Sequence, residues 1–171
     1  DELCKWYSDL CPSLNVHKVE FTHRSLMTFE MNVGTKDEFL GELKYQIKTG
    51  IDRIIAGMDS AADTAIAEYS LHKGTVQEGA IGEDGKLHSS WTELLMKDPI
   101  AFMKKFVPHS LAFSPACGSG WNCNVGDFFK KFFLLGTGVL GVDGMLQIAA
   151  RDRNTASTRH SWIAPKGLPQ Y

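Results

Sequence analysis

The sequence feature that most constrains the fold is the apolar run at residues 132–142, which only glycines and one threonine interrupt. It lies within a stretch, 117–150, that opens with two cysteines and continues apolar after Asp143 and Gly144. Such a run has to be buried in a core, a partner or a membrane, because exposing apolar surface to water costs about 25 cal/mol per Å². A spanning helix needs about 20 apolar residues, and this run has 11 before Asp143. We therefore exclude a transmembrane helix here and expect a core segment or a binding surface.

Length and composition indicate one globular domain covering residues 1–171. Hydrophobic residues make up 43% of the chain and charged residues 22%, as in ordinary folded domains. The chain begins at Asp1 and shows no charged-then-apolar leader. We therefore expect a processed product whose signal peptide has been removed, with an artificially trimmed chain as the alternative.

The four cysteines form two closely spaced pairs, Cys4 with Cys11 and Cys117 with Cys123. An even number in close pairs favours disulfides and an oxidising compartment, so we expect a secreted, extracellular protein. Three connectivities are open, one local and two that join the N-terminus to the Cys117 loop. Zinc ligand pairs have about two to four intervening residues, whereas these pairs have six and five. We therefore predict neither a metal site nor a cofactor.

Hydrophobic periodicity and capping residues predict the secondary structure. Residues 16–33 alternate as strands do, and Thr35 with Glu38 forms a capping box that begins one long amphipathic helix, about 36–57. Its apolar face includes Ile47, Ile51 and Ile54, which we expect in the core. The further predicted elements are a helix at 60–72, a hairpin at 75–87, helices that start at Ser90 and Asp98, a helix at 127–135, a hairpin or glycine-rich helix at 139–149, and a short strand at 161–164.

The irregular alternation of these strands and helices favours the α+β class. The order strand, long helix, hairpin, helix, strand suits a split βαβ-type α/β sandwich. We therefore predict a single compact domain of this kind, with one long helix and disulfide-bounded loops.

Charge is distributed unevenly along the chain. Residues 1–99 carry 10 basic and 17 acidic side chains, whereas residues 100–171 carry 8 basic and 3 acidic ones. The basic part is also rich in phenylalanine and glycine. It either meets an anionic partner or complements the acidic part of the same protein.

A cluster of aromatic and basic residues in the basic part is the candidate binding surface: Phe128, Phe129, Lys130, Lys131, Phe132 and Phe133. Aromatic insertion beside lysines is typical of binding to anionic lipid, although the same rings would also make a buried helix. We therefore predict a secreted effector or toxin-like module that binds a protein partner or an anionic membrane surface without catalysis. Nucleic acid is disfavoured as a partner.

Residues 136–141 match the G-x-G-x-x-G pattern of dinucleotide sites, in which backbone N–H groups approach a pyrophosphate at a helix N-terminus. That site needs a strand before the glycines and a helix after them. Here the preceding run looks helical, and Asp143 interrupts the expected helix. We therefore predict no nucleotide cofactor.

The alternative function is a small secreted hydrolase, similar in its chemistry to a ribonuclease. Such a site needs a base and an acid that face each other across a groove. His17, His23 and Glu30 lie in the predicted strand region, and the two histidines share a face only if that strand is unbroken. A cleft that gathers two histidines and a carboxylate would favour the hydrolase, and scattered histidines would favour the binding module.

Overall fold

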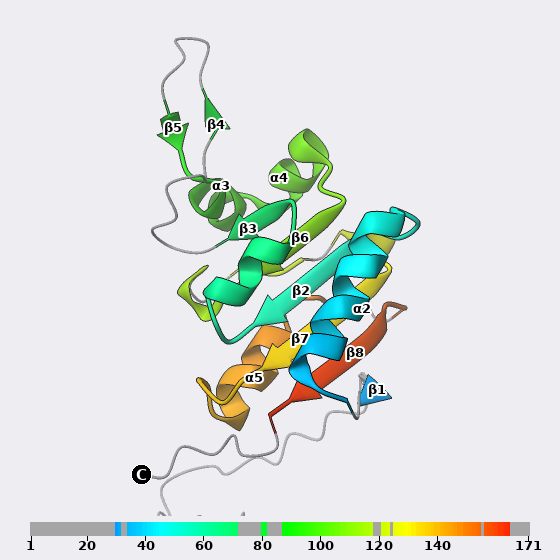
Figure 1. Ribbon diagram of the computed structural model, residues 1–171. Helices are drawn as coiled ribbons and strands as arrows, with labels where there is room; N and C mark the ends of the chain where they lie inside the picture. The colour runs from blue at the N-terminus through cyan, green and yellow to red at the C-terminus, as the bar shows by residue number, and fades with distance from the viewer. Residues whose placement is uncertain are drawn as a thin grey trace, which may run out of the picture.

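A parallel β-sheet forms the centre of the computed structural model, which describes residues 30–31, 34–71, 80–81, 87–117, 121–123, 125–154 and 156–164. The strand order is β1-β8-β7-β2-β6-β3, and every neighbouring pair runs parallel (Figure 1). The strands are β1 (Glu30–Met31), β2 (Ile54–Met58), β3 (Tyr69–Leu71), β6 (Ser110–Phe113), β7 (Lys131–Gly136) and β8 (Thr158–Ile163). A separate antiparallel pair joins β4 (Ala80–Ile81) to β5 (Leu87–Ser89).

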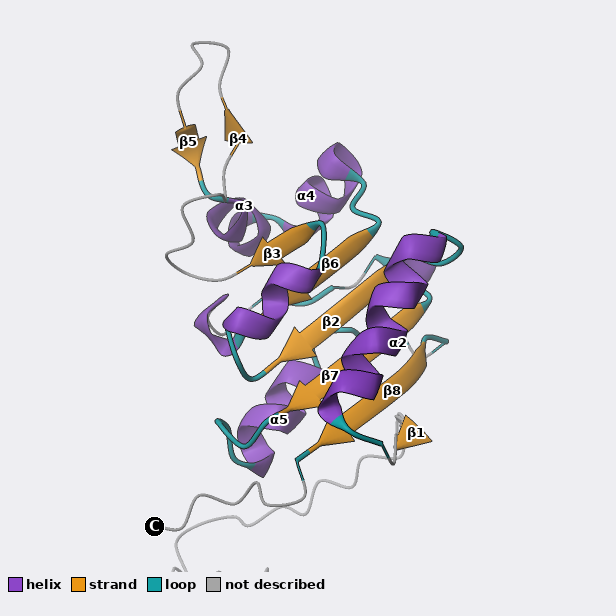
Figure 2. Cartoon of the chain, viewed as in Figure 1, coloured by secondary structure: helices purple, strands orange, loops and turns teal. Residues whose placement is uncertain are grey.

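Helices cover both faces of the sheet (Figure 2). On one face α2 (Lys36–Thr49) packs Phe39 and Leu43 into a cluster that includes Phe133. On the other face α5 (Val142–Ala149) places Ile148 in a cluster with Phe132. The helices α3 (Trp91–Lys97) and α4 (Pro99–Phe106) join the α5-side cluster, and the short 3-10 turns are η1 (Ala62–Ile66), η2 (Pro115–Cys117) and η3 (Gly126–Phe128).

The described residues form one compact α/β domain, which confirms the predicted compact domain, but the main sheet is parallel, so the finer prediction of an α+β class with a split βαβ arrangement is wrong. A parallel sheet needs crossover connections and is buried on both faces, so its strands read as continuous apolar runs instead of alternating ones. All five residues of β2 are buried, as are the last five of β7. This pattern is the reason that periodicity did not reveal these strands.

The predicted long helix at 36–57 is two elements. The helix α2 ends at Gly50, whose φ of 65° places it in the left-handed region that glycine adopts readily. Ile54 then begins β2 and is buried, whereas Ile51 lies in the connecting loop and is 80% exposed. The expectation that Ile51 is a core residue is therefore wrong.

Two more predicted elements differ in type from the structure, and in a third the helical alternative is correct. The predicted helix at 127–135 is mostly β7, and the segment 139–149 contains α5, the competitor of the hairpin. The predicted helix at 60–72 is the turn η1 followed by β3. Asp143 and Gly144 do not form the β-turn of a hairpin but lie in the first turn of α5. An acidic side chain stabilises the N-terminus of a helix.

Other local predictions are confirmed. Thr35 with Glu38 and Ser90 with Glu93 form complete capping boxes at the starts of α2 and α3. Asp98 caps α4 ahead of its first-turn proline. The hairpin prediction is confirmed by the antiparallel pairing of β4 with β5. None of the helices in the described ranges is long and apolar enough to cross a bilayer.

No disulfide joins Cys117 to Cys123, so the local connectivity predicted for this pair is wrong. The two buried side chains are held by different neighbours: Cys117 Sγ donates a hydrogen bond of 2.7 Å to the Leu71 carbonyl, and Cys123 pairs through its backbone with Asp152. Burial, together with the nearby Asp152 carboxylate, raises the pKa of the Cys123 thiol to about 12. Cys4 and Cys11 lie outside the described residues.

This arrangement predicts the behaviour of the two thiols. In a variant with Cys4→Ser and Cys11→Ser, a thiol reagent should label neither Cys117 nor Cys123 in the native protein and both after denaturation, because buried thiols are not accessible. Intact-mass measurement before and after reduction should show no change. A mass that rises on reduction by two hydrogens would show that a disulfide joins them.

The close approach of α5 to the sheet depends on Gly57 in β2. A Cβ at this position would overlap Ile148 Cγ2 and would lie 3.1 Å from Phe113 Cζ. We predict that Gly57→Ala lowers the free energy of unfolding by about 1–3 kcal/mol, as overpacking does. The matched control is Gly41→Ala in α2, where a Cβ would meet nothing within 4 Å, and which should stabilise the protein by about 0.5–1 kcal/mol. Urea denaturation measures both, and equal effects would contradict the close packing.

Candidate functional site

The carboxyl ends of β2 and β7 form the topological switch point of the sheet. These strands are neighbours, but the chain leaves β2 toward β3 and leaves β7 toward β8, on opposite sides (Figure 1). Loops that diverge in this way leave a crevice at the carboxyl edge of an open parallel sheet, and ligands bind there in this class of fold. The candidate site is therefore the carboxyl edge around β2, β6 and β7.

A buried carboxylate joins the two diverging loops. Asp59 directly follows β2 and is only 4% exposed. Its Oδ2 accepts hydrogen bonds from the backbone N–H groups of Thr137, Gly138 and Val139 at 2.8, 3.0 and 3.0 Å. Its Oδ1 accepts a further bond of 2.9 Å from the Thr137 hydroxyl. Successive N–H groups that converge on one oxygen form an anion-binding nest, which the protein fills with its own carboxylate.

The glycine-rich segment 136–141 lies between a strand and a helix, which is the context that the sequence argument had denied it. The strand β7 ends at Gly136, and α5 begins after Gly141, which provides no side-chain cap. Gly138 has a φ of 94°, a conformation that strongly favours glycine. The first N–H groups of a helix have no intrahelical partner, so the start of α5 offers donors that Asp59 does not use.

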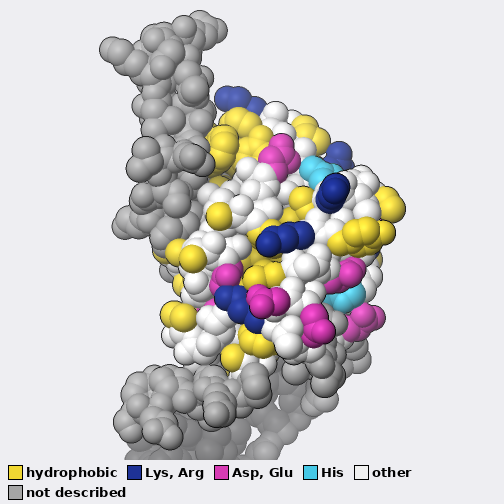
Figure 3. All heavy atoms as spheres, in the orientation of Figure 1, with side chains coloured by type: hydrophobic (Ala, Val, Ile, Leu, Met, Phe, Trp, Pro, Cys, Tyr) yellow, Lys and Arg dark blue, Asp and Glu magenta, His cyan; other side chains and the backbone are white. Residues whose placement is uncertain are grey.

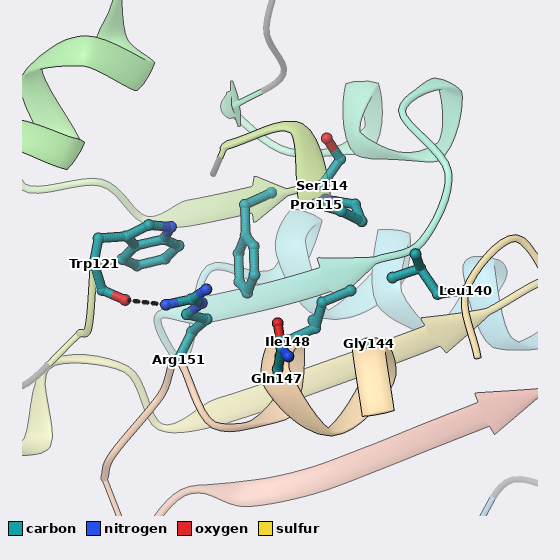
Figure 4. A pocket seen from close by; sticks show the side chains of 9 residues that line it. Ser114, Pro115, Trp121, Leu140, Gly144, Gln147, Ile148 and Arg151 are labelled. Carbon is teal, nitrogen blue, oxygen red and sulfur yellow. Dashed lines mark hydrogen bonds between the residues drawn. The ribbon is translucent and has the colours of Figure 1, made fainter. Parts of the chain in front are cut away.

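A cavity of about 170 Å³ lies beside this segment, between the end of β6 and α5. Figure 4 shows Trp121 and Arg151 together at one end and Leu140 at the other, with Gln147 and Ile148 rising from α5. The residues that line it are Phe113, Ser114, Pro115, Trp121, Leu140, Gly144, Gln147, Ile148 and Arg151. Its walls therefore come from the end of β6, from α5 and from three loops, and the cavity extends along α5 from Leu140 at the carboxyl edge to Arg151 beyond the end of the helix.

Aromatic rings and one guanidinium dominate the chemistry of this cavity. The rings of Phe113 and Trp121 meet edge to face, with centroids 4.9 Å apart. Arg151 Nη1 donates a hydrogen bond of 2.9 Å to the Trp121 carbonyl, which holds the guanidinium against the aromatic wall (Figure 4). Such a wall accepts planar rings, and a guanidinium attracts anions. The lining residues include no histidine, cysteine or carboxylate, so they offer no general acid or base.

The predicted binding residues do not form one surface. The rings of Phe129, Phe132 and Phe133 are buried in the two core clusters, while Phe128 is half-buried beneath the guanidinium of Arg53. Lys130 is exposed, and Lys131 lies 3.2 Å from Asp52. The prediction that this cluster binds a partner therefore rests on Phe128, Lys130 and Lys131, because the other rings pack inside the domain.

The residues of the hydrolase alternative are only partly described. His17 and His23 lie outside the described residues, and Glu30 pairs with His160, at 3.3 Å between Oε2 and Nδ1. His160 stacks on Phe133 and belongs to β8. His109 directly precedes β6, which β7 and β2 separate from β8. Within the described ranges, therefore, no cleft unites two histidines with a carboxylate, and no group of three potential metal ligands is found.

Sequence reasoning missed Asp59, Trp121, Gln147 and Arg151. The G-x-G-x-x-G match was the signal that pointed to this edge, and it was set aside because β7 was taken for a helix and Asp143 for an interruption of the helix that follows, which is α5. Compared with family models, with curated proteins and with solved structures, the chain matches none.

The role of Asp59 predicts a large effect of removing its carboxylate. Asp59→Ala leaves the loop N–H groups without their acceptor, so it should lower the free energy of unfolding by about 1–3 kcal/mol. The control is Asp63→Ala, which removes an ion pair of 2.8 Å to the more exposed Lys36 and should cost about 1 kcal/mol or less. Backbone hydrogen exchange at Thr137, Gly138 and Val139 should be faster in Asp59→Ala and unchanged in Asp63→Ala. Unchanged rates in Asp59→Ala would show that its carboxylate does not hold this loop.

Proposed function

We propose that this domain is a non-catalytic binding module whose cavity takes a small ligand that combines a planar ring with a negative charge, as nucleotides do. The observation that carries the proposal is the cavity between Trp121 and α5, whose Leu140 end lies in the loop that leaves the switch point of a parallel sheet. Clefts at such points are the usual ligand sites of doubly wound sheets.

The cavity favours a ring over an extended apolar ligand. Its volume of about 170 Å³ is below the roughly 300–1,000 Å³ of sites that enclose a whole drug-sized molecule. It therefore has room for one ring system against Phe113 and Trp121, and the rest of the ligand lies outside.

The anionic group of the ligand can bind at either of two places. Arg151 stands at the Trp121 end of the cavity, and the first turn of α5 stands near the Leu140 end. Helix N-termini attract phosphate and carboxylate groups through their unpaired N–H groups. The Asp59 carboxylate already fills the nest at residues 137–139, so a phosphate would lie beyond Val139, over Leu140 and Gly141.

The absence of an acid or base among the lining residues supports binding over catalysis at this cavity. The hydrolase alternative stays a prediction that depends on His17 and His23. Secretion and an effector or toxin-like role also stay predictions, and so does binding to a protein or a membrane, which would take place on a different surface from this cavity.

Isothermal titration calorimetry with a ligand series tests the proposal. The series separates ring, sugar and phosphate: adenosine, ribose 5-phosphate, inorganic phosphate, AMP, ADP and ADP-ribose. We expect binding of at least one ligand that has both ring and phosphate, and weaker or absent binding of its parts. Binding to none of them, or equal binding of inorganic phosphate alone, would overturn the proposal.

Two variants locate the binding. Arg151→Gln removes a charge-assisted contact and should weaken binding by about 10- to 100-fold. Arg153→Gln is the matched control, because Arg153 is exposed and lies outside the cavity. Ser114→Leu fills the cavity and should abolish binding, with circular dichroism confirming that the variants are folded. Unchanged affinity in both Arg151→Gln and Ser114→Leu would show that the ligand binds elsewhere.

A further inference from the structure

The amino edge of the sheet, opposite Asp59 and the loop that follows β7, gathers three loops. The loop at 50–53 joins α2 to β2, the loop at 107–109 joins α4 to β6, and residues 127–130 precede β7. Backbone hydrogen bonds connect them: Ile54 N–H donates to the His109 carbonyl at 2.9 Å, and Lys130 N–H donates to the Arg53 carbonyl at 2.9 Å. We call this edge, with the last turns of α2 and α4, the amino rim.

Two large aliphatic side chains are exposed on the amino rim. Ile51 is 80% exposed, the highest value among the exposed large hydrophobic side chains of the described residues, and Val107 is 49% exposed. They belong to adjacent loops, because a Cβ on Gly50 would lie 3.9 Å from His109 Nε2. Exposed aliphatic side chains that gather at one edge mark an interaction surface more than single scattered ones do.

Val107 also has an unfavourable backbone. Its φ of 46° and ψ of 51° are left-handed, and it is the one non-glycine residue with positive φ in the described ranges. A β-branched residue is rare in this conformation, and glycine is the usual residue at this helix end. A valine that is 49% exposed gains only part of the burial that would offset the strain. Strain retained at an exposed position points to a function.

Basic side chains surround these two residues. The rim, together with the adjoining Glu68 and Lys131, has six basic residues against three acidic ones, Asp52, Glu68 and Asp127. The basic residues are Lys48, Arg53, Lys104, Lys105, Lys130 and Lys131. On the side where α2 ends in Figure 1, the surface shows Lys and Arg side chains interspersed with hydrophobic ones (Figure 3).

Local roles explain only part of this arrangement. Lys48, Lys104 and Lys105 lie in the last turns of α2 and α4, where cations interact favourably with the helix dipole. Lys131 pairs with Asp52, and Lys130 lies 3.6 Å from Asp127. Neither effect accounts for the exposure of Ile51 or for the strained valine.

We propose that the amino rim docks on anionic membrane surfaces, with Ile51 and Val107 inserted at the headgroup boundary and the lysines attracted to the lipid phosphates. The charge of the rim complements such a surface, and aliphatic side chains at loop tips gain by leaving water. Neither Ile51 nor Val107 lines the pocket of about 270 Å³ beside the last turn of α4, so insertion into a lipid surface fits these side chains better than binding of a peptide in that pocket. Phe129, Phe132 and Phe133 are buried and therefore do not contribute to this docking surface.

Sedimentation with phosphatidylcholine vesicles, with and without phosphatidylserine, tests this docking at low and high salt. We expect the protein to bind only the vesicles that contain phosphatidylserine and to dissociate as salt rises. Lys104→Glu/Lys105→Glu should weaken the partition by about tenfold or more. Binding to neither vesicle type at low salt, or binding that ignores both lipid charge and salt, would overturn the proposal.

A second pair of variants separates insertion from folding. Ile51→Ser/Val107→Gly should weaken vesicle binding by about tenfold while raising the melting temperature, because glycine relieves the strain at Val107. The control is Val142→Ser/Leu146→Ser, which removes side chains that are 63% and 61% exposed on α5 and should leave binding unchanged. Loss of binding only in this control would assign the contact to α5 instead. A protein that ignores vesicles but binds RNA with the same sensitivity to the rim variants would refute membrane docking.

Discussion

The arrangement of the loops at the carboxyl edge depends on the hydrogen bonds between the Asp59 carboxylate and the loop after β7. The chain diverges at β2 and β7, so nothing in the sheet itself fixes how their following loops meet. The Asp59 carboxylate fixes the position of one loop against the other, because it accepts hydrogen bonds from three backbone N–H groups and one hydroxyl. The loop then enters α5 at Gly141, and α5 closes one side of the cavity. A side chain at position 59 that cannot accept hydrogen bonds would leave these part-buried donors without their acceptor, which is costly.

The parallel sheet separates two kinds of surface. All of its strands run in one direction, so every loop that follows a strand lies at one edge and every loop that precedes a strand lies at the other. The carboxyl edge has the Asp59 loop contact and the Leu140 end of the cavity, which runs along α5 toward Trp121 and Arg151 (Figure 4). The amino edge has the ends of α2 and α4, with lysines and exposed aliphatic tips. The two proposed sites share no residue, so separate variants test them.

The sequence revealed the helix starts but not the class of the fold, and the reason is physical. A capping box is a local hydrogen-bond pattern, so Thr35 with Glu38 and Ser90 with Glu93 identified α2 and α3 without tertiary information. The burial of β7 is a tertiary property, and its phenylalanines read equally well as a helix face. That one misassignment removed the strand in front of the G-x-G-x-x-G segment. It therefore hid the switch point, and with it the role of Asp59.

The far wall of the cavity shows why its remaining residues escape sequence reasoning. Trp121 and Arg151 are 30 positions apart and meet through a hydrogen bond of 2.9 Å. The segment that carries Trp121 is held by a backbone bridge from Cys123, whose N–H donates to the Arg151 carbonyl at 2.8 Å. Behind this bridge, Arg159 Nη2 donates to the Asp152 carbonyl at 3.0 Å, and Ser157 donates to the Asp152 carboxylate at 2.8 Å. Removing one partner from a buried charged network is strongly destabilising. The aromatic wall thus depends on β8 and on buried polar contacts that no spacing of residue types along the chain reveals.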